Sequence, residues 1–303
     1  MKKKDLNTHE NKKENNILDE FGKVKDAITN ATVDKSKKLI IDAIDENGDG
    51  EIDIEDIITK GMKLPGIWVN REDFLQKELL RKYPQEVIDI AIKNTPAYAK
   101  IEQQEIDKIA DEVIKYERIC VSGISAALSA PGGVASVATI PVDIVQYYGY
   151  LLRVMQKLMY LYGFPEISRA KDGVQFDAET MNILIICMGV MYGVAEANIA
   201  LKTIASALAK GVEKKLLRAA LTKGTIYPIV KKVSSWFGKA MTKQVFAGFF
   251  KKSIPIIGGV LGGGITFVSF KLCCDKLKST LQNTVLTNPD NDVFDTEEVL
   301  IIE

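Results

Sequence analysis

The chain has 303 residues, of which 47% are hydrophobic and 26% charged, and its 40 basic residues balance 40 acidic ones. This composition suits one large or two smaller soluble domains with an ample core. The single histidine, His9, lies in a polar N-terminal stretch. The folded part therefore cannot hold a histidine-based catalytic triad, zinc site or general base.

Charge and cysteine are unevenly placed along the chain. Residues 1–118 hold 21 basic and 26 acidic side chains, whereas residues 199–252 hold 12 basic ones and only Glu213 as an acid. The neutral total thus hides a strongly cationic segment. The four cysteines lie in apolar runs without a C-x-x-C pair, which predicts reduced core thiols: Cys120, Cys187, Cys273 and Cys274.

The N-terminal part divides into a polar head and a helical segment. Residues 1–16 are rich in lysine and asparagine, and we expect them to be disordered. No apolar stretch follows the basic start, so we expect no signal peptide and a cytoplasmic protein. Apolar residues between positions 17 and 44 then predict one or two amphipathic helices.

Residues 45–56, with the sequence DENGDGEIDIED, carry the sharpest motif. They resemble the EF-hand calcium loop over its twelve positions. In that loop, side-chain oxygens at positions one, three and five, a backbone carbonyl at seven and a carboxylate at twelve surround the ion, and glycine allows the turn at six. The resemblance assigns these roles to Asp45, Asn47, Asp49, Glu51 and Asp56, with Gly50 at the turn and Asp53 acting through a water.

One position departs from the EF-hand pattern. Most EF-hands use glutamate at position twelve to reach the ion with both oxygens, whereas this chain has Asp56. The shorter side chain weakens that contact or shifts selectivity from Ca²⁺ toward the smaller Mg²⁺. The alternative is an acidic turn without a metal. We expect an EF-hand-type segment over residues 17–66, which ends at Pro65 and Gly66.

Residues 71–118 predict two short amphipathic helices and a longer one, and an uncharged stretch follows between Arg118 and Asp143. Pro141 then predicts the start of a long helix. One face of that helix would carry Ile144, Tyr148, Leu151, Met155, Leu158 and Tyr162, and the opposite side Asp143, Gln146, Tyr147, Tyr150, Arg153 and Lys157. Asp143 and Arg153 could form a polar site there, or serve as a helix-start residue and part of a core polar network.

The C-terminal part contains a helical pattern over residues 176–209 and the cationic segment with interleaved aromatic residues over 202–252. Its uncharged run at 183–195 is too short to span a bilayer, which favours a buried core helix. Residues 253–270 are uncharged and contain Pro255 and five glycines. A closing helix over 271–286 and an acidic tail over 287–303 complete the chain.

Two of these stretches resemble the bacterial EcsC family. The central one contains PGG, IPVDI and a Tyr/Leu-rich helix ending in YLYGF, and the second is SIPIIGGVLGGGITF at 253–267. The resemblance implies an all-α, multi-helix bundle, here over residues 71–286 and preceded by the small EF-hand-type helix-loop-helix. It also implies a frequent link to an export transporter by gene neighbourhood, and no established reaction.

The motifs favour a binding protein over an enzyme. The chain has no G-x-S-x-G nucleophile elbow and no phosphate-binding P-loop. The cationic segment has the spacing of amphipathic helices, and most of the chain outside it is acidic, so we expect no nucleic-acid partner. Two interpretations stay open: peripheral association with an anionic membrane, or a soluble accessory role with a protein partner in a secretion or transport system. The lipid-facing candidates are Lys231, Lys232, Lys251 and Lys252.

Overall fold

The computed structural model describes residues 38, 41–42, 44–129, 135–167, 176–211, 214–240 and 263–288. These residues form helices, turns and loops without a strand, and the predicted all-α class is confirmed. The chain divides into two compact units, Met1–Ala43 and Ile44–Glu303. In the first unit the described residues are helical, and the second unit contains helices α2 to α10 and α12. The head at 1–16 and the tail from 289 onward lie outside the described residues.

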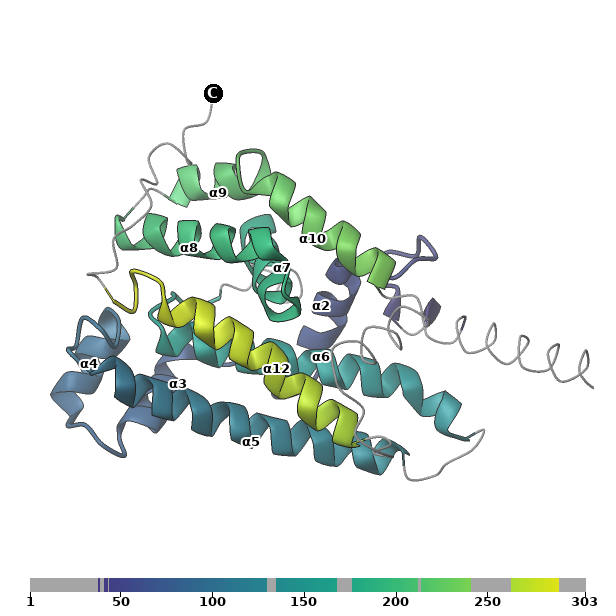
Figure 1. The fold of residues 1–303 in the computed structure, drawn as a ribbon, viewed down its shortest axis with the longest axis horizontal. Helices are drawn as coiled ribbons and strands as arrows, with labels where there is room; N and C mark the ends of the chain where they lie inside the picture. Colours follow the sequence, from purple (N-terminus) through teal and green to yellow (C-terminus); the bar gives the residue numbers. More distant parts are fainter. Residues whose placement is uncertain are drawn as a thin grey trace, which may run out of the picture. The chain divides into compact units, whose positions relative to one another are not determined.

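Three long helices form one layer: α5 (Gln103–Ser129), α6 (Ala135–Leu161) and α12 (Gly263–Gln282). They pack against one another along their lengths, as Figure 1 shows. α5 and α6 run antiparallel, because Ser125 contacts Asp143 near one end while Glu117 contacts Lys157 further along. Residues far apart in the sequence thereby become neighbours.

A second layer consists of α7 (Ala178–Tyr192), α8 (Ala195–Ala209), α9 (Lys214–Thr222) and α10 (Tyr227–Ala240). α7 contacts each of the other three and also α12, which explains why its sequence is largely buried and carries no charge after Glu179. The helical pattern expected over 176–209 is interrupted at Gly193, whose φ of 81° ends α7 in the left-handed conformation. Glycine adopts that conformation without the steric cost of a side chain.

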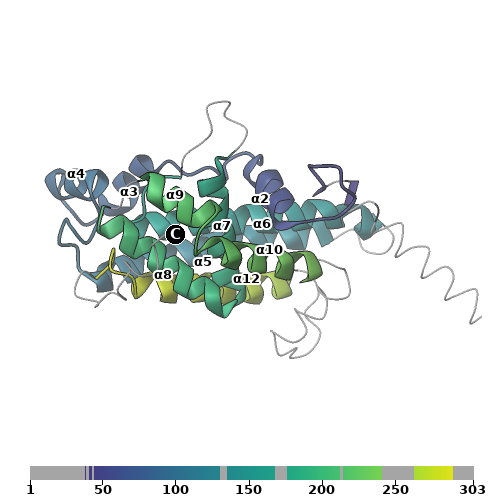
Figure 2. The ribbon, with the colours of Figure 1, turned by 90° about the horizontal axis from the view of Figure 1, so that it is seen from above.

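The remaining helices are α2 (Ile54–Met62), α3 (Arg71–Leu79) and α4 (Gln85–Lys93). α3 and α4 lie at the opposite end from the start of α6 (Figure 2). Arg71 joins them, since its guanidinium donates to the carbonyl oxygens of Ile92 and Asn94 at 2.5 and 2.8 Å. The same side chain donates to the Phe164 carbonyl, so it ties the end of α4 to the segment after α6.

α2 lies directly on α6 at a crossing of two glycines. A Cβ added to Gly149 would lie 2.9 Å from Leu64 Cδ1 and 3.4 Å from the Gly61 carbonyl oxygen. Such an approach is open to residues without a side chain. The apolar face of α2 is fully buried, and the helix belongs to the same compact unit as the body that begins, by sequence, at residue 71.

α6 differs from its predicted form in two respects. It begins at Ala135 rather than at Pro141, so this proline lies inside the helix and its nitrogen donates no hydrogen bond. The side opposite the predicted apolar face is also shielded from solvent: Gln146 is 8% and Tyr147 6% exposed, and the other four residues on it are half-buried. The reason is that α2, α5 and α12 surround α6 on several sides. The predicted apolar face is buried as expected, except that Ile144 is half-buried.

The four cysteines are free thiols, as predicted, with Cys120 half-buried and the other three buried. None of the helices in the described part of the chain combines the length and the apolar character needed to cross a membrane.

Candidate functional site

The loop over residues 45–56 is organised around the Asp45 carboxylate. Its Oδ1 accepts a hydrogen bond from the Gly48 nitrogen at 2.6 Å, and its Oδ2 accepts one from the Gly50 nitrogen at 2.8 Å. The two glycines have φ values of 77° and 83°, and no atom lies within 4 Å of a Cβ built on either. Backbone conformation, not space, therefore requires glycine at both positions.

The next two predicted ligands repeat this arrangement. Asn47 Oδ1 accepts from the Asp49 nitrogen at 2.9 Å, and Asp49 Oδ1 accepts from the Glu51 nitrogen at 2.8 Å. Each side chain thus folds back onto the backbone two residues later, as short polar residues do in turns. The side-chain oxygens of Asp45, Asn47 and Asp49 are thus held in place along an exposed loop.

The end of the loop is closed by a pair of carboxylates at the start of α2. Asp53 caps the helix by accepting from the Asp56 nitrogen at 2.8 Å, and Asp56 Oδ2 accepts from the Asp53 nitrogen at 3.1 Å. Asp56 Oδ1 also accepts from the Glu46 nitrogen at 3.0 Å, so this residue joins the two ends of the loop. Asp56 is only 3% exposed, and burial is the main cause that raises its pKa and that of Asp53.

The structure therefore brings the predicted ligands into one loop, with Asp56 at its closing point. It does not bring three acidic, histidine or cysteine side chains to a common point in the described residues, so the ligand set stays a prediction. The available donors are carboxylate, amide and carbonyl oxygens, which is the donor type that Ca²⁺ and Mg²⁺ prefer.

Glu46, the second residue of the loop, makes contacts that the sequence motif did not indicate. Its Oε1 lies 2.7 Å from Lys60 Nζ and its Oε2 lies 2.6 Å from Lys63 Nζ. Hydrogen bonds from both lysines lower the pKa of Glu46, and the bond from Lys60 has the larger effect. These two lysines lie at the C-terminal end of α2, so the loop is tied to both ends of that helix.

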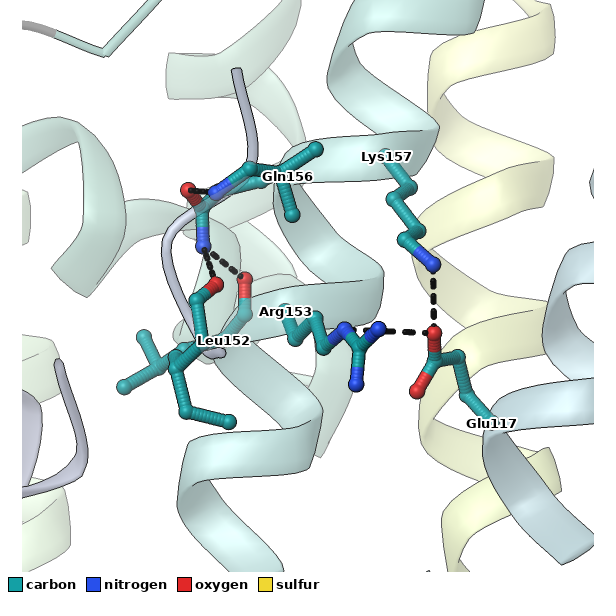
Figure 3. A network of polar contacts seen from close by, with 7 residues as sticks. Glu117, Leu152, Arg153, Gln156 and Lys157 are labelled. Carbon is teal, nitrogen blue, oxygen red and sulfur yellow. Dashed lines mark hydrogen bonds and ion pairs between the residues drawn. The ribbon is translucent and has the colours of Figure 1, made fainter. Parts of the chain in front are cut away.

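The second predicted site, Asp143 with Arg153, is not assembled. Asp143 accepts a 2.6 Å hydrogen bond from Ser125, whereas Arg153 lies 3.4 Å from Glu117 Oε1 (Figure 3). Ten residues along a helix correspond to about 15 Å, which is too far for one site. Each residue instead makes its own polar contact between α5 and α6, and that of Arg153 belongs to a buried polar network, part of the alternative that the sequence also allowed.

Glu117 is the centre of this network, and no sequence motif pointed to it. Its side chain is 0% exposed, and Lys157 Nζ approaches its Oε1 at 2.5 Å (Figure 3). A buried carboxylate requires such partners, because desolvation of an unpaired charge is costly. The available signal was the helical spacing that places Glu117 on the inner face of α5, opposite the basic residues of α6.

Gln156 is a second buried polar residue that no sequence motif singled out. Its Oε1 accepts from the Val69 nitrogen at 3.1 Å, and its Nε2 donates to the Ile67 and Leu152 carbonyls at 3.0 Å (Figure 3). This side chain fixes the segment between α2 and α3 on α6. Its role is structural.

The cationic candidates have different surroundings. Lys231 on α10 is exposed, and its Nζ lies 4.9 Å from the centre of the Tyr227 ring. Lys232 forms an ion pair with Glu196 on α8, so part of its charge is neutralised. Lys251 and Lys252 lie outside the described residues.

A surface cavity of about 440 Å³ lies between α3, the end of α4 and the segment after α6. Arg71 lines it, but its donors already bind backbone carbonyls, and Glu166 accepts from the Arg71 nitrogen at 3.2 Å. These groups hold the fold together, and the cavity presents no assembled catalytic group.

Comparisons of the chain with protein-family models, curated proteins and solved structures find no match. The likenesses to the EF-hand loop and to the EcsC family therefore rest on the motifs in the chain itself.

Proposed function

We propose that the protein is a non-enzymatic, calcium-binding protein with an EcsC-like helical body. The observation that carries this proposal is the hydrogen-bonded loop over residues 45–56, in which Asp45, Asn47 and Asp49 are each fixed by backbone N–H groups. Prearranged oxygens lower the entropic cost of forming a coordination shell. The lone pairs left on these oxygens can bind a hard cation.

Asp56 sets the expected selectivity. Both of its oxygens accept backbone hydrogen bonds within the loop, and its short side chain is buried. We therefore expect a compact site that prefers Ca²⁺ yet accepts Mg²⁺, the smaller ion, better than a loop ending in glutamate.

For the helical body we propose peripheral association with the cytoplasmic face of an anionic membrane. Several large hydrophobic side chains are exposed on its helices, including Ile119 and Val142, each 55% exposed. Exposed apolar residues and basic residues together favour adsorption to a charged lipid surface. The alternative is a soluble accessory protein of a secretion or transport system, which would use the same residues to bind a protein partner.

Calorimetric titration of the purified chain with CaCl₂ tests the metal site. We expect saturable binding that disappears in the Asp45→Ala, Asp49→Ala double variant. Asp73→Ala with Asp89→Ala is the matched control, because both residues are exposed acids on α3 and α4. Equal calcium uptake by the loop variant and the wild type would refute the proposal, provided that circular dichroism shows both to be folded.

A further inference from the structure

One end of the three-helix layer has an unusual sequence. This end, named the distal end, comprises residues 119–129 of α5, 135–150 of α6 and 263–270 of α12. Asp143 is the single charged residue in these three stretches. The described parts of two uncharged runs, 119–142 and 253–270, which are separated by more than a hundred residues, thus meet in space at this end (Figure 1).

Contacts between the helices establish this arrangement. Ser125 on α5 donates to Asp143 on α6, and Tyr147 on α6 donates to Ser269 on α12 at 3.3 Å. The Arg118 guanidinium lies 3.9 Å from the centre of the Phe267 ring, which joins α5 to α12 at the base of the distal end.

Polar side chains lie inside the distal end. Ser125 is 1% exposed, Gln146 8% and Ser269 5%. The Ser122 hydroxyl and both polar atoms of the Gln146 amide are buried and have no hydrogen-bond partner within the described part of the chain. Asp143 also turns toward α5.

Apolar side chains lie outside. The described side chains of the distal end include five large hydrophobic ones that are exposed, with exposed fractions of 37–55%: Ile119, Ile124, Val142, Phe267 and Val268. Apolar side chains such as Val121, Tyr148 and Phe270 are also buried between the helices, but the exposed apolar groups around buried polar ones depart from the pattern of a water-soluble helical bundle. Polar groups between helices and apolar groups on the surface are typical of helices surrounded by lipid.

Basic and aromatic residues mark the base of the distal end. The first charged residues beyond it on the three helices are Arg118, Arg153 and Lys271. Tyr116, 60% exposed, lies at the same level on α5. Long basic side chains and tyrosines are enriched where a protein passes from the acyl chains to the headgroups, because one end of each is apolar and the other polar.

The dimensions agree with shallow insertion. The uncharged part of α5 has eleven residues, from 119 to 129, which corresponds to about 16 Å of helix. This length is roughly half of the hydrocarbon core of a bilayer, which is about 30 Å thick. A helix end of this size reaches into one leaflet.

We infer that the distal end is the membrane-binding element of the protein: it inserts into the acyl region of one leaflet, with anionic phospholipid headgroups at Arg118. Arg153 and Lys271 lie at the same level, but each is paired with an acidic side chain, Glu117 and Asp275 respectively. This inference rests on the proposed membrane association and identifies the surface of the protein that makes the contact. It places the contact on α5, α6 and α12, whereas the lysines of α10 contribute only long-range attraction.

Flotation of the purified full chain with vesicles of phosphatidylcholine and phosphatidylglycerol tests this assignment. The test variant is Ile119→Glu with Ile124→Glu. The matched control is Ile90→Glu with Ile199→Glu, because these isoleucines are 42% and 59% exposed on α4 and α8. Both pairs add the same charge at exposed helical isoleucines. Val142→Glu with Val268→Glu provides a second test pair on the other two helices.

We expect the wild type and the control to float, and both test pairs to lose at least about tenfold in partitioning, since each replaces two apolar anchors. If the wild type floats and the test pairs float equally well, the membrane association stands and the assignment to the distal end is wrong. If the wild type does not float, both proposals fail. If, without vesicles, the wild type is a dimer that Ile119→Glu with Ile124→Glu converts to a monomer, a second copy of the chain covers this surface and the inference is overturned.

Discussion

Gly189 in the last turn of α7 allows three helices to meet. A Cβ at this position would lie 2.8 Å from Val233 Cγ2 on α10 and 2.9 Å from Ala197 Cβ on α8. Neither neighbour can move aside by rotating a flexible side chain, since one is β-branched and the other is a methyl group on the helix backbone. The substitution Gly189→Ala should therefore separate α7 from α8 and α10.

The magnitude depends on two opposing contributions. Overpacking of a well-packed core costs about 1–3 kcal/mol, and replacing glycine by alanine inside a helix contributes about 1 kcal/mol of stability. The contacts at Gly189 place this site at the upper end of the first range, so we expect a net loss of about 1–2 kcal/mol. For a unit of this size the loss lowers the melting temperature by about 2–8 °C.

Gly238 on α10 is the matched control. It is also helical, but no atom lies within 4 Å of a Cβ built there, and the residue is exposed. The same substitution, Gly238→Ala, should raise stability by up to about 1 kcal/mol, because the helix contribution acts alone. Urea unfolding followed by circular dichroism measures both variants. If Gly189→Ala is as stable as Gly238→Ala, the packing argument for the second layer is wrong.

Three further predictions concern the helix layer, the thiols and the loop. Glu117→Ala should lower the free energy of unfolding by about 3–5 kcal/mol in urea titrations, because Lys157 would lose its buried partner. A loss below about 1 kcal/mol would show that the contacts of Glu117 do not stabilise the helix layer. At pH 8 Ellman's reagent should react with one thiol per folded chain, Cys120, and with four in denaturant, since burial raises the pKa of thiols such as Cys187 to about 12. Rapid reaction of a second thiol in the folded chain would contradict this prediction. Asp56→Glu should raise the ratio of Ca²⁺ to Mg²⁺ affinity in calorimetry by about tenfold, and an unchanged ratio would show that this position does not set selectivity.

Local features of the loop could be predicted from the sequence because each depends on neighbours within a few residues. Gly50 was expected at the turn, and its φ of 83° requires glycine there; the structure adds Gly48, with a φ of 77°, and the hydrogen bonds from both glycines to Asp45. Such interactions repeat wherever the same spacing occurs. The all-α class follows from helical periodicity in the same way.

Contacts between distant segments could not be predicted in this way. Nothing in the spacing of residues along α6 indicates that Gly149 packs against Gly61, or that Arg153 binds Glu117 rather than Asp143. Helical periodicity placed Gln146 and Tyr147 on the side opposite the apolar face, but it could not show that this side is buried as well, because α6 is covered on several sides. The uncharged runs at 119–142 and 253–270 were visible in the sequence, but the meeting of their described parts at one end depends on the packing of α12 against α5 and α6.

The central claim, a cation site in the loop, is tested most directly by the amide resonances of Gly48 and Gly50 in ¹⁵N-labelled protein. Their N–H groups donate to the Asp45 carboxylate, so an ion bound by that carboxylate would change their environment. We expect both resonances to shift on titration with Ca²⁺ and to saturate, while that of the exposed Gly238 stays in place. Resonances of Gly48 and Gly50 that remain fixed at millimolar Ca²⁺ would contradict the account.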